Sequence, residues 1–383
     1  MTSKVEPGQW LGVLGGGQLG RMFAQAAQSL GYRVAVYEPA EHCPAGDVAD
    51  HHFAAAYDNW EQLSAFCERC AAVTVEFENV PPQALEFVAE RTRLAPNASA
   101  FATARSRRNE KTLFTSLGVD PVPWRYTESP SDIRDAYAEL GPDVVLKTNE
   151  FGYDGKGQWR IASIDSLENA VSAIGNTPCV MEKRIDLDRE FSVVLARADN
   201  GDVATFDVVE NVHVSGILHT STVPSCADEA QQDRLVGAAR AIAESLDYVG
   251  VMAVEFFVAK DGRVYTNEMA PRPHNSGHYT MNGCRSSQFE QQARALAGLP
   301  LGSAELHSPT VMINLLGDAW SPVLPLKRLL SQPGVNVHLY GKADAKPGRK
   351  MGHINVTAPS AEKVGRLAEY SIEVLGVGAT HQG

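Results

Sequence analysis

The first hundred residues alternate short apolar runs with longer stretches in which apolar residues recur at helical spacing. The apolar runs at 10–14, 33–37 and 72–77 predict strands, and the stretches at 19–30 and 60–70 predict helices. Strands that alternate with helices in this way are typical of a parallel sheet covered by helices. The N-terminal region therefore predicts an α/β fold.

The pattern changes after residue 100. A charged helical stretch at 100–117 leads to prolines at 121 and 123, which mark a boundary because proline interrupts regular pairing. A mixed region follows from 124 to 299 and ends in a predicted helix at 287–297. The tail predicts strands at 310–315 and 335–339 and a last helix at 361–375. At 383 residues the chain is too long for one core, so we expect two or three domains.

Composition narrows the class of partner. The formal net charge of −12 and the pI near 5.4 argue against a nucleic-acid or membrane-surface partner. No apolar run approaches the roughly 18 residues of a membrane span, and the N-terminus lacks the apolar core of a signal peptide, so we expect a cytoplasmic protein. The six cysteines are scattered and read as reduced thiols. Cys67 and Cys70 match a redox C-x-x-C pattern, but their predicted helix favours structural thiols.

Two acids on neighbouring predicted strands are the strongest chemical signal. Glu255 lies in the run 251–257 and Glu268 in the run 264–274, with Asp261 and Gly262 between them as a type I′ hairpin turn. That turn places both carboxylates close together on one sheet face. Such a pair, with the amide of Asn267 beside it, suits Mg²⁺ bound to substrate phosphates. The alternative is two solvated acids on a hairpin.

A glycine turn at 15–20 follows a predicted strand and opens a helix. Its G-x-G-x-x-G spacing, with Glu38 at the end of the next strand, also fits a nicotinamide-dependent oxidoreductase. Unpaired N–H groups at a helix N-terminus bind any anion, however, so the turn alone does not identify the ligand.

A second glycine loop spans 152–158 and follows a short strand that ends in Lys147. Three glycines around Lys156 suit a loop that closes over phosphates, although a hairpin turn with a solvated lysine has the same composition. Further on, the run 179–183 ends in Glu182 and Lys183, and Glu190 follows. Such a run can offer an adenine its backbone donors and a ribose its carboxylate.

The order of these features resembles that of ATP-grasp enzymes. More narrowly, the chain resembles the N5-carboxyaminoimidazole ribonucleotide synthetase family of purine biosynthesis over nearly its whole length. The resemblance rests on GGGQLGRM at 15–22, FENV at 77–80, GYDGKGQW at 152–159, PRPHNSGH at 271–278, SQFE at 287–290 and PGRKMGH at 347–353. Phe151 and Leu187 depart from the family pattern, where we expect glycine and phenylalanine.

The resemblance implies a fold of three parts. These are a Rossmann-like pre-ATP-grasp domain at 1–105, a two-lobed ATP-grasp domain at 106–303 with lobes at about 124–190 and 191–303, and a small C-terminal domain at 304–383. It implies α/β and α+β architecture, and the N-terminal glycine loop then serves the substrate.

The resemblance also implies an activity. ATP phosphorylates bicarbonate to carboxyphosphate, and 5-aminoimidazole ribonucleotide captures the carbon dioxide released from it. Glu255 and Glu268 would hold Mg²⁺. The residues implied to contact ATP are Arg107, Lys147, Gly152, Tyr153, Asp154, Gly155, Lys156, Gly157, Gln158, Glu182, Lys183, Arg184, Ile185, Glu190, His213, Asn267 and Glu268.

The remaining implied residues surround the ribonucleotide. They are Gln18, Leu19, Glu78, Tyr153, Asp154, Arg272, His274, Asn275, Ser276, Lys342, Arg349 and Lys350. Lys147, Lys156, Arg272, His274 and Asn275 are the expected catalytic residues. His274 and His278 have a spacing that would also suit zinc, but we expect hydrogen bonding to substrate. His274 or released phosphate would accept the amine proton.

Two rival functions stay open at this point. One is an ATP-grasp ligase or formate-using transformylase with another acceptor, against which the segments 271–278 and 347–353 speak. The other is a nucleotide-binding or NAD-binding module without catalysis, which intact Lys147, Glu255 and Glu268 disfavour. We expect a homodimer because twofold symmetry is common among enzymes.

Overall fold

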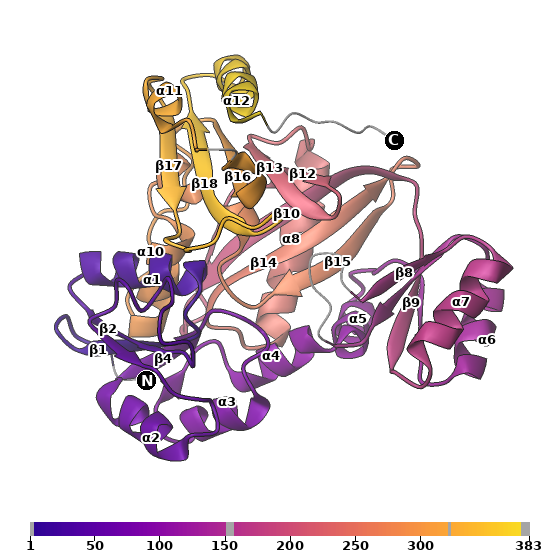
Figure 1. Cartoon of the computed structure of the whole chain (residues 1–383), viewed down its shortest axis with the longest axis horizontal. Helices are drawn as coiled ribbons and strands as arrows, with labels where there is room; N and C mark the ends of the chain where they lie inside the picture. The colour runs from indigo at the N-terminus through magenta and orange to yellow at the C-terminus, as the bar shows by residue number, and fades with distance from the viewer. Residues whose placement is uncertain (1–3, 151–156, 321–322, 377–383) are drawn as a thin grey trace.

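The computed structural model describes residues 4–150, 157–320 and 323–376. Three sheets organise these residues (Figure 1). The N-terminal sheet lies beside the C-terminal strands, a small sheet with its own helices lies at the opposite end, and the large sheet runs between them (Figure 1).

The N-terminal sheet has five parallel strands in the order β3-β2-β1-β4-β5, which confirms the predicted α/β fold. The strands β1, β2 and β4 are buried almost throughout because helices cover both faces. The bounds are β1 (Trp10–Leu14), α1 (Gln18–Ser29), β2 (Arg33–Tyr37), β3 (His51–Phe53), α2 (Trp60–Arg69), β4 (Ala72–Val75), α3 (Pro82–Ala89) and β5 (Arg93–Leu94).

The small sheet is antiparallel, in the order β6-β9-β7-β8. Ser129 and Ser163 cap the helices that pack on it, because each hydroxyl accepts an N–H from the first turn. The bounds are β6 (Trp124–Thr127), α6 (Pro130–Leu140), β7 (Val144–Thr148), β8 (Gln158–Ile161), α7 (Ile164–Ile174) and β9 (Cys179–Lys183).

Strands from the centre and the end of the chain share the large sheet. Its path is β15-β14-β10-β12-β13-β16-β18-β17, and β11 pairs with β10. The strands are β10 (Leu187–Arg197), β11 (Val203–Thr205), β12 (Val209–Val214), β13 (Ile217–Val223), β14 (Gly250–Ala259), β15 (Val264–Ala270), β16 (Thr310–Leu316), β17 (Val335–Leu339) and β18 (Lys350–Thr357). The helices around it are α8 (Glu229–Ser245), α9 (Thr280–Gly283), α10 (Gln288–Ala297), α11 (Leu326–Leu330) and α12 (Ala361–Leu375).

Two predicted boundaries fall within this sheet. Strand β10 joins it from Leu187 onward, so the strand spans the lobe boundary placed at 190/191. Strand β16 pairs with β13, so the region predicted as a separate domain from 304 continues the hydrogen bonding of the central one.

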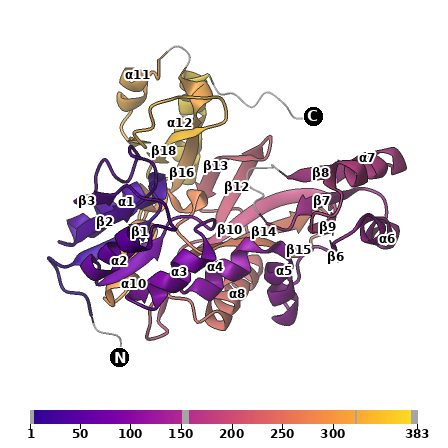
Figure 2. The ribbon, with the colours of Figure 1, turned by 60° about the horizontal axis from the view of Figure 1, so that its bottom comes forward.

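The stretch predicted as helical at 100–117 is helical but interrupted at Ser106. The chain forms α4 (Ala98–Arg105) and α5 (Arg107–Ser116), with an extended residue, Ser106, between them. The Ser106 hydroxyl accepts the Asn109 N–H and so begins a new helix. The break sets α5 at an angle to α4, as Figure 2 shows, and both helices contact β15.

The six cysteines are all free, and five of them, including Cys67 and Cys70, are buried. Burial raises the pKa of Cys67 to about 11, which is the behaviour of a structural thiol. Among the described residues, no helix combines the length and the apolar character needed to cross a membrane.

Candidate active site

The two acids Glu255 and Glu268 lie directly opposite each other on β14 and β15, which confirms the prediction that they lie close together. The register that pairs them depends on a bulge. Phe256 pairs with Thr266, but the residue before it on β14, Glu255, pairs with Glu268. Strand β15 therefore contributes one extra residue, Asn267.

The turn between these strands differs from the prediction. A type I′ turn needs a positive φ at both Asp261 and Gly262, and of these two only Gly262 has one, at 82°. The Gly262 N–H donates to the Ala259 carbonyl at 2.8 Å, which places Lys260 and Asp261 at the centre of the turn. Asp261 is free to occupy a negative φ because Gly262 takes the left-handed position after it.

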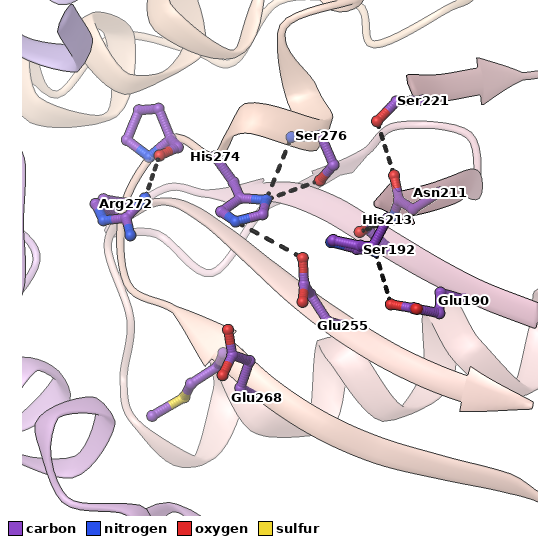
Figure 3. A network of polar contacts seen from close by, with 12 residues as sticks. Glu190, Ser192, Asn211, His213, Ser221, Glu255, Glu268, Arg272, His274 and Ser276 are labelled. Atoms are coloured by element: carbon purple, nitrogen blue, oxygen red, sulfur yellow. Dashed lines mark hydrogen bonds and ion pairs between the residues drawn. The ribbon is translucent and has the colours of Figure 1, made fainter. Parts of the chain in front are cut away.

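Burial and mutual repulsion are the main electrostatic effects on the Glu255 carboxylate. Burial, and then the charge of Glu268, raise the pKa of Glu255 to about 7. The Glu268 carboxylate lies 3.6 Å from Arg107, and His274 Nε2 lies 3.7 Å from Glu255 Oε1. Figure 3 shows both acids on neighbouring strands with His274 over Glu255. Two oxygen donors that repel each other, next to the amide of Asn267, suit a hard divalent cation.

Glu190 and His213 form a second polar pair beside the acids (Figure 3). Glu190 Oε2 lies 2.8 Å from His213 Nδ1, across the pairing of β10 with β12. Burial alone would lower the pKa of His213, but the hydrogen bond and charge of Glu190 raise it. The pair can present a cation and an oxygen acceptor to one ligand.

Lys147 is buried and held by Glu182, whose carboxylate it contacts at 2.7 Å. Lys111, which sequence reasoning missed, contacts the other oxygen of Glu182 at 2.8 Å. Burial would raise the pKa of Glu182, but the two ammonium groups hold it below its usual value. Burial lowers the pKa of Lys147, and Glu182 opposes that change. Lys111 could have been found from the sequence as a charged residue on the inward face of helix α5.

A cavity of about 400 Å³ collects most of these groups. Of the predicted ATP and metal residues, those that line it are Arg107, Lys147, Gln158, Glu190, His213, Glu255, Asn267 and Glu268. Gly152, Tyr153, Asp154, Gly155 and Lys156 lie outside the described residues. Gly157, with φ of 70°, leads into β8.

The end of β9 and the two residues after it do not line this cavity; these residues are Glu182, Lys183, Arg184 and Ile185. The N–H groups of Lys183 and Arg184 donate to the carbonyls of Pro123 and Asp143. The Ile185 N–H has no partner among the described residues, and this leaves one backbone donor for a ligand.

A second cavity, of about 230 Å³, adjoins the first. Arg272, His274, Asn275 and Lys350 line both cavities, so the two share a wall. Of the other predicted substrate residues, Gln18 and Leu19 line the second cavity and Glu78 the first. Glu78 also holds Arg272 Nε at 2.8 Å. Ser276 is buried and bonds to His274 Nδ1 at 2.9 Å.

Lys342 and Arg349 do not line either cavity. Lys342 Nζ donates to the main-chain carbonyl of Lys350 at 2.8 Å, and the charges of Arg349 and Lys350 both act on Lys342. Burial, and then the charge of Arg349, lower the pKa of Lys342 to about 8, while Glu76 acts in the opposite direction. The three predicted cations therefore gather near the second cavity, with Lys350 closest to it.

Protein carboxylates accept three N–H groups of the N-terminal glycine loop. The Glu76 carboxylate accepts the N–H groups of Gly17 and, at 2.6 Å, Gly20. Glu38 accepts the Gly16 N–H at 3.1 Å. Protein carboxylates thus occupy the place of a dinucleotide phosphate, which removes the structural basis for the oxidoreductase alternative.

His274 and His278 each use one ring nitrogen within the protein. The Ser276 N–H donates to His274 Nδ1 at 3.3 Å, and Gln288 Nε2 lies 2.9 Å from His278 Nδ1. Burial lowers the pKa of both rings. Both rings are therefore neutral hydrogen-bonding groups.

Comparisons with known proteins agree along the chain. Residues 9–105 match the ribonucleotide synthetase preATP-grasp domain, residues 112–289 the ATP-grasp domain, and residues 310–366 the phosphoribosylaminoimidazole carboxylase C-terminal domain. The chain is 43% identical over 359 residues to N5-carboxyaminoimidazole ribonucleotide synthase of Brucella melitensis, across 93% of this chain and 98% of the relative.

Solved structures give the same picture. An ADP complex of an N5-carboxyaminoimidazole ribonucleotide synthetase superposes with a TM-score of 0.94 at 38% identity, over 99% of this chain and 100% of that one. An N5-carboxyaminoimidazole synthase from Aspergillus clavatus, in complex with ADP and 5-aminoimidazole ribonucleotide, superposes with a TM-score of 0.88 at 31% identity, over 97% and 99% of the chains.

Proposed function

The chain belongs to the N5-carboxyaminoimidazole ribonucleotide synthase family, and from its two adjoining cavities we propose where each substrate of that reaction binds. It is an ATP-dependent ligase that converts 5-aminoimidazole ribonucleotide to N5-carboxyaminoimidazole ribonucleotide in purine biosynthesis. The observation that carries the assignment of substrates is the shared wall of Arg272, His274, Asn275 and Lys350. Acids and a buried lysine lie on one side of that wall, and the ribonucleotide would bind on the other.

ATP would occupy the larger cavity. Lys147, fixed by Glu182, would contact its phosphates, and the Ile185 N–H would serve the adenine. The residues proposed to bind ATP are Arg107, Lys147, residues 152–158, Glu182, Lys183, Arg184, Ile185, Glu190, His213, Asn267 and Glu268.

Glu255 and Glu268 would hold magnesium. Their direct opposition and the raised pKa of Glu255 support this role, because a cation between them would relieve the repulsion. Magnesium held by Glu255 and Glu268 would supply positive charge against the negative charge that develops during phosphoryl transfer.

Bicarbonate would be the carboxyl donor. Its oxygen attacks the γ-phosphorus of ATP, the bond to the bridging oxygen breaks, and ADP leaves. The resulting carboxyphosphate loses phosphate to give carbon dioxide, and the amine of the ribonucleotide attacks that carbon. Lys147 and Lys156 are proposed to stabilise the phosphoryl group, and Arg272 and Asn275 to orient the acceptor.

His274 would act as a hydrogen-bond donor. Its Nδ1 accepts the Ser276 N–H, so the neutral ring carries its proton on Nε2, on the side of Glu255. A ring in this tautomer has no vacant nitrogen for the amine proton. We therefore propose that released phosphate accepts that proton.

The ribonucleotide would occupy the smaller cavity, with its phosphate near Lys342, Arg349 and Lys350. Gln18, Leu19, Glu78, Arg272, His274, Asn275, Ser276 and residues 153–154 would complete its site. The domain bounds, the homodimer and the cytoplasmic location stay predictions from the sequence.

The test is ADP release by purified protein with magnesium, ATP and bicarbonate, with and without the ribonucleotide. We expect release to depend on the ribonucleotide and label from bicarbonate to enter an acid-labile product. Release that is independent of bicarbonate would contradict the proposed carboxyl donor, and label that enters without ATP would contradict the carboxyphosphate route.

A further inference from the structure

One face of helix α5 reaches both halves of the ATP site. Arg107, Glu110 and Lys111 share that face because residues three and four apart lie together on a helix. Glu110 is 2% exposed and Lys111 is 1% exposed. Arg107 and Glu110 contact β15 of the large sheet, whereas Lys111 contacts Glu182 on β9 of the small sheet.

Glu110 binds the backbone of the metal-binding strand. Its Oε1 accepts the Met269 N–H at 2.7 Å, and Met269 directly follows Glu268. Strand β15 is at the edge of the large sheet, so among the described residues no strand satisfies the N–H groups on its outer side. One of them, at Thr266, donates to the Asp120 carbonyl at 2.9 Å.

The bulge decides which later N–H faces outward. In a regular strand, outward-facing N–H groups recur every second residue. After Thr266, the next outward N–H group would then be that of Glu268, and the Met269 N–H would face β14. The extra residue at Asn267 reverses this alternation, and the Met269 N–H points to α5 instead. The same reversal sets Glu268, and not Asn267, opposite Glu255. The Glu110 contact is therefore made only when the acids are paired.

We propose that Glu110 is a positioning residue whose carboxyl group holds the β15 bulge and thereby sets Glu268 opposite Glu255 for metal binding. The proposal rests on the proposed magnesium role of the two acids. Removal of the acceptor leaves the Met269 N–H buried without a partner, which favours an unbulged register.

The test compares two neutral replacements of similar size. Glu110→Gln keeps an oxygen that can accept the Met269 N–H, and Glu110→Met removes it. ADP binding is measured by titration calorimetry with and without magnesium, because this readout needs no turnover. Phe114→Leu, a buried change one turn further along α5 that keeps the Glu110 carboxyl group, controls for loosening of α5.

We expect Glu110→Met to weaken magnesium-dependent ADP binding by about tenfold or more, as changes next to metal ligands do, with metal-free ADP binding unchanged. Glu110→Gln and Phe114→Leu should bind like the wild type in both conditions. Should Glu110→Met fail to fold, Glu110→Asn replaces it, because its shorter amide cannot reach Met269.

Three outcomes overturn the proposal. Unchanged magnesium-dependent binding in Glu110→Met shows that the bulge needs no support, and equal loss with and without metal shows a general structural role. Equal loss in Glu110→Gln shows that the charge or direct ligation matters instead. If wild-type protein itself binds ADP equally with and without magnesium, the metal site of the proposed function fails first.

Discussion

Replacement of Glu76 should loosen the start of helix α1. The N-cap residue Gly17 has no side chain, so Glu76 at the end of β4 supplies the acceptor that a serine or aspartate usually provides. Glu76→Met removes both hydrogen bonds and adds no acceptor. Burial raises the pKa of Glu76, so part of this stabilisation is already offset by the loss of hydration.

The size of the effect follows from the two N–H groups. Loss of a cap costs about 1 kcal/mol, and the buried Gly20 N–H left without a partner adds about 1–3 kcal/mol. After the offset from burial we expect about 2 kcal/mol for Glu76→Met. Glu76→Gln keeps one oxygen acceptor and should cost about half as much.

Hydrogen exchange read by mass spectrometry measures this locally. A loss of about 2 kcal/mol increases the opening equilibrium of the α1 N-terminal turn about 30-fold, and amide exchange there should rise by that factor. Glu86→Met, the same substitution at an exposed position on α3, is the control. Exchange in Glu76→Met equal to that of the control would refute the assignment of Glu76 as the remote cap.

Three further predictions concern the active site. Glu268→Ala should lower ADP formation by more than about 100-fold because a magnesium ligand is lost, and an unchanged circular dichroism spectrum with normal turnover would contradict that role. Lys111→Met should lower the free energy of unfolding by about 2 kcal/mol in urea titration, less than the loss of a whole buried ion pair, because Lys147 still pairs with Glu182. The control Lys260→Met removes an exposed ion pair and should cost under about 0.5 kcal/mol. Equal losses in the two variants would contradict the stabilising role of buried Lys111. The lowered pKa of Lys342 keeps its side chain charged below about pH 8 and neutral above it, so the KM for the ribonucleotide should rise above that pH. Lys342→Arg should move the rise to higher pH because arginine stays charged. A KM that is flat from pH 7 to 9 would exclude Lys342 from phosphate binding.

The hairpin shows how much of the site could be predicted. Sequence reasoning placed Glu255 and Glu268 close together on one sheet face through a two-residue turn, and they are close together. The actual turn shifts the register by one residue, and the bulge at Asn267 shifts it back. Local turn preferences do not encode this compensation, because it depends on α5, which is far from the hairpin in sequence.

Long-range polar contacts account for the other differences. Glu76 and Gly17 are 59 residues apart, so nothing near the glycine loop indicates that a protein carboxylate fills it. The break at Ser106 was readable in principle, since serine is a preferred N-cap, but the surrounding helical pattern concealed it. Motif order, by contrast, indicated the family and most cavity residues because each motif is contiguous.

The pairing of β13 with β16 has a consequence for any exchange of parts between relatives. A cut near residue 304 would expose residues 220–223 of β13 as an open strand edge, with N–H and C=O groups available to pair with another molecule. A shortened chain of this kind would self-associate, and a chimaera would need to transfer β13 together with the strands beyond it. The structural unit that can be exchanged between relatives is therefore the continuous sheet, and its strands lie on both sides of the predicted domain boundary at 304.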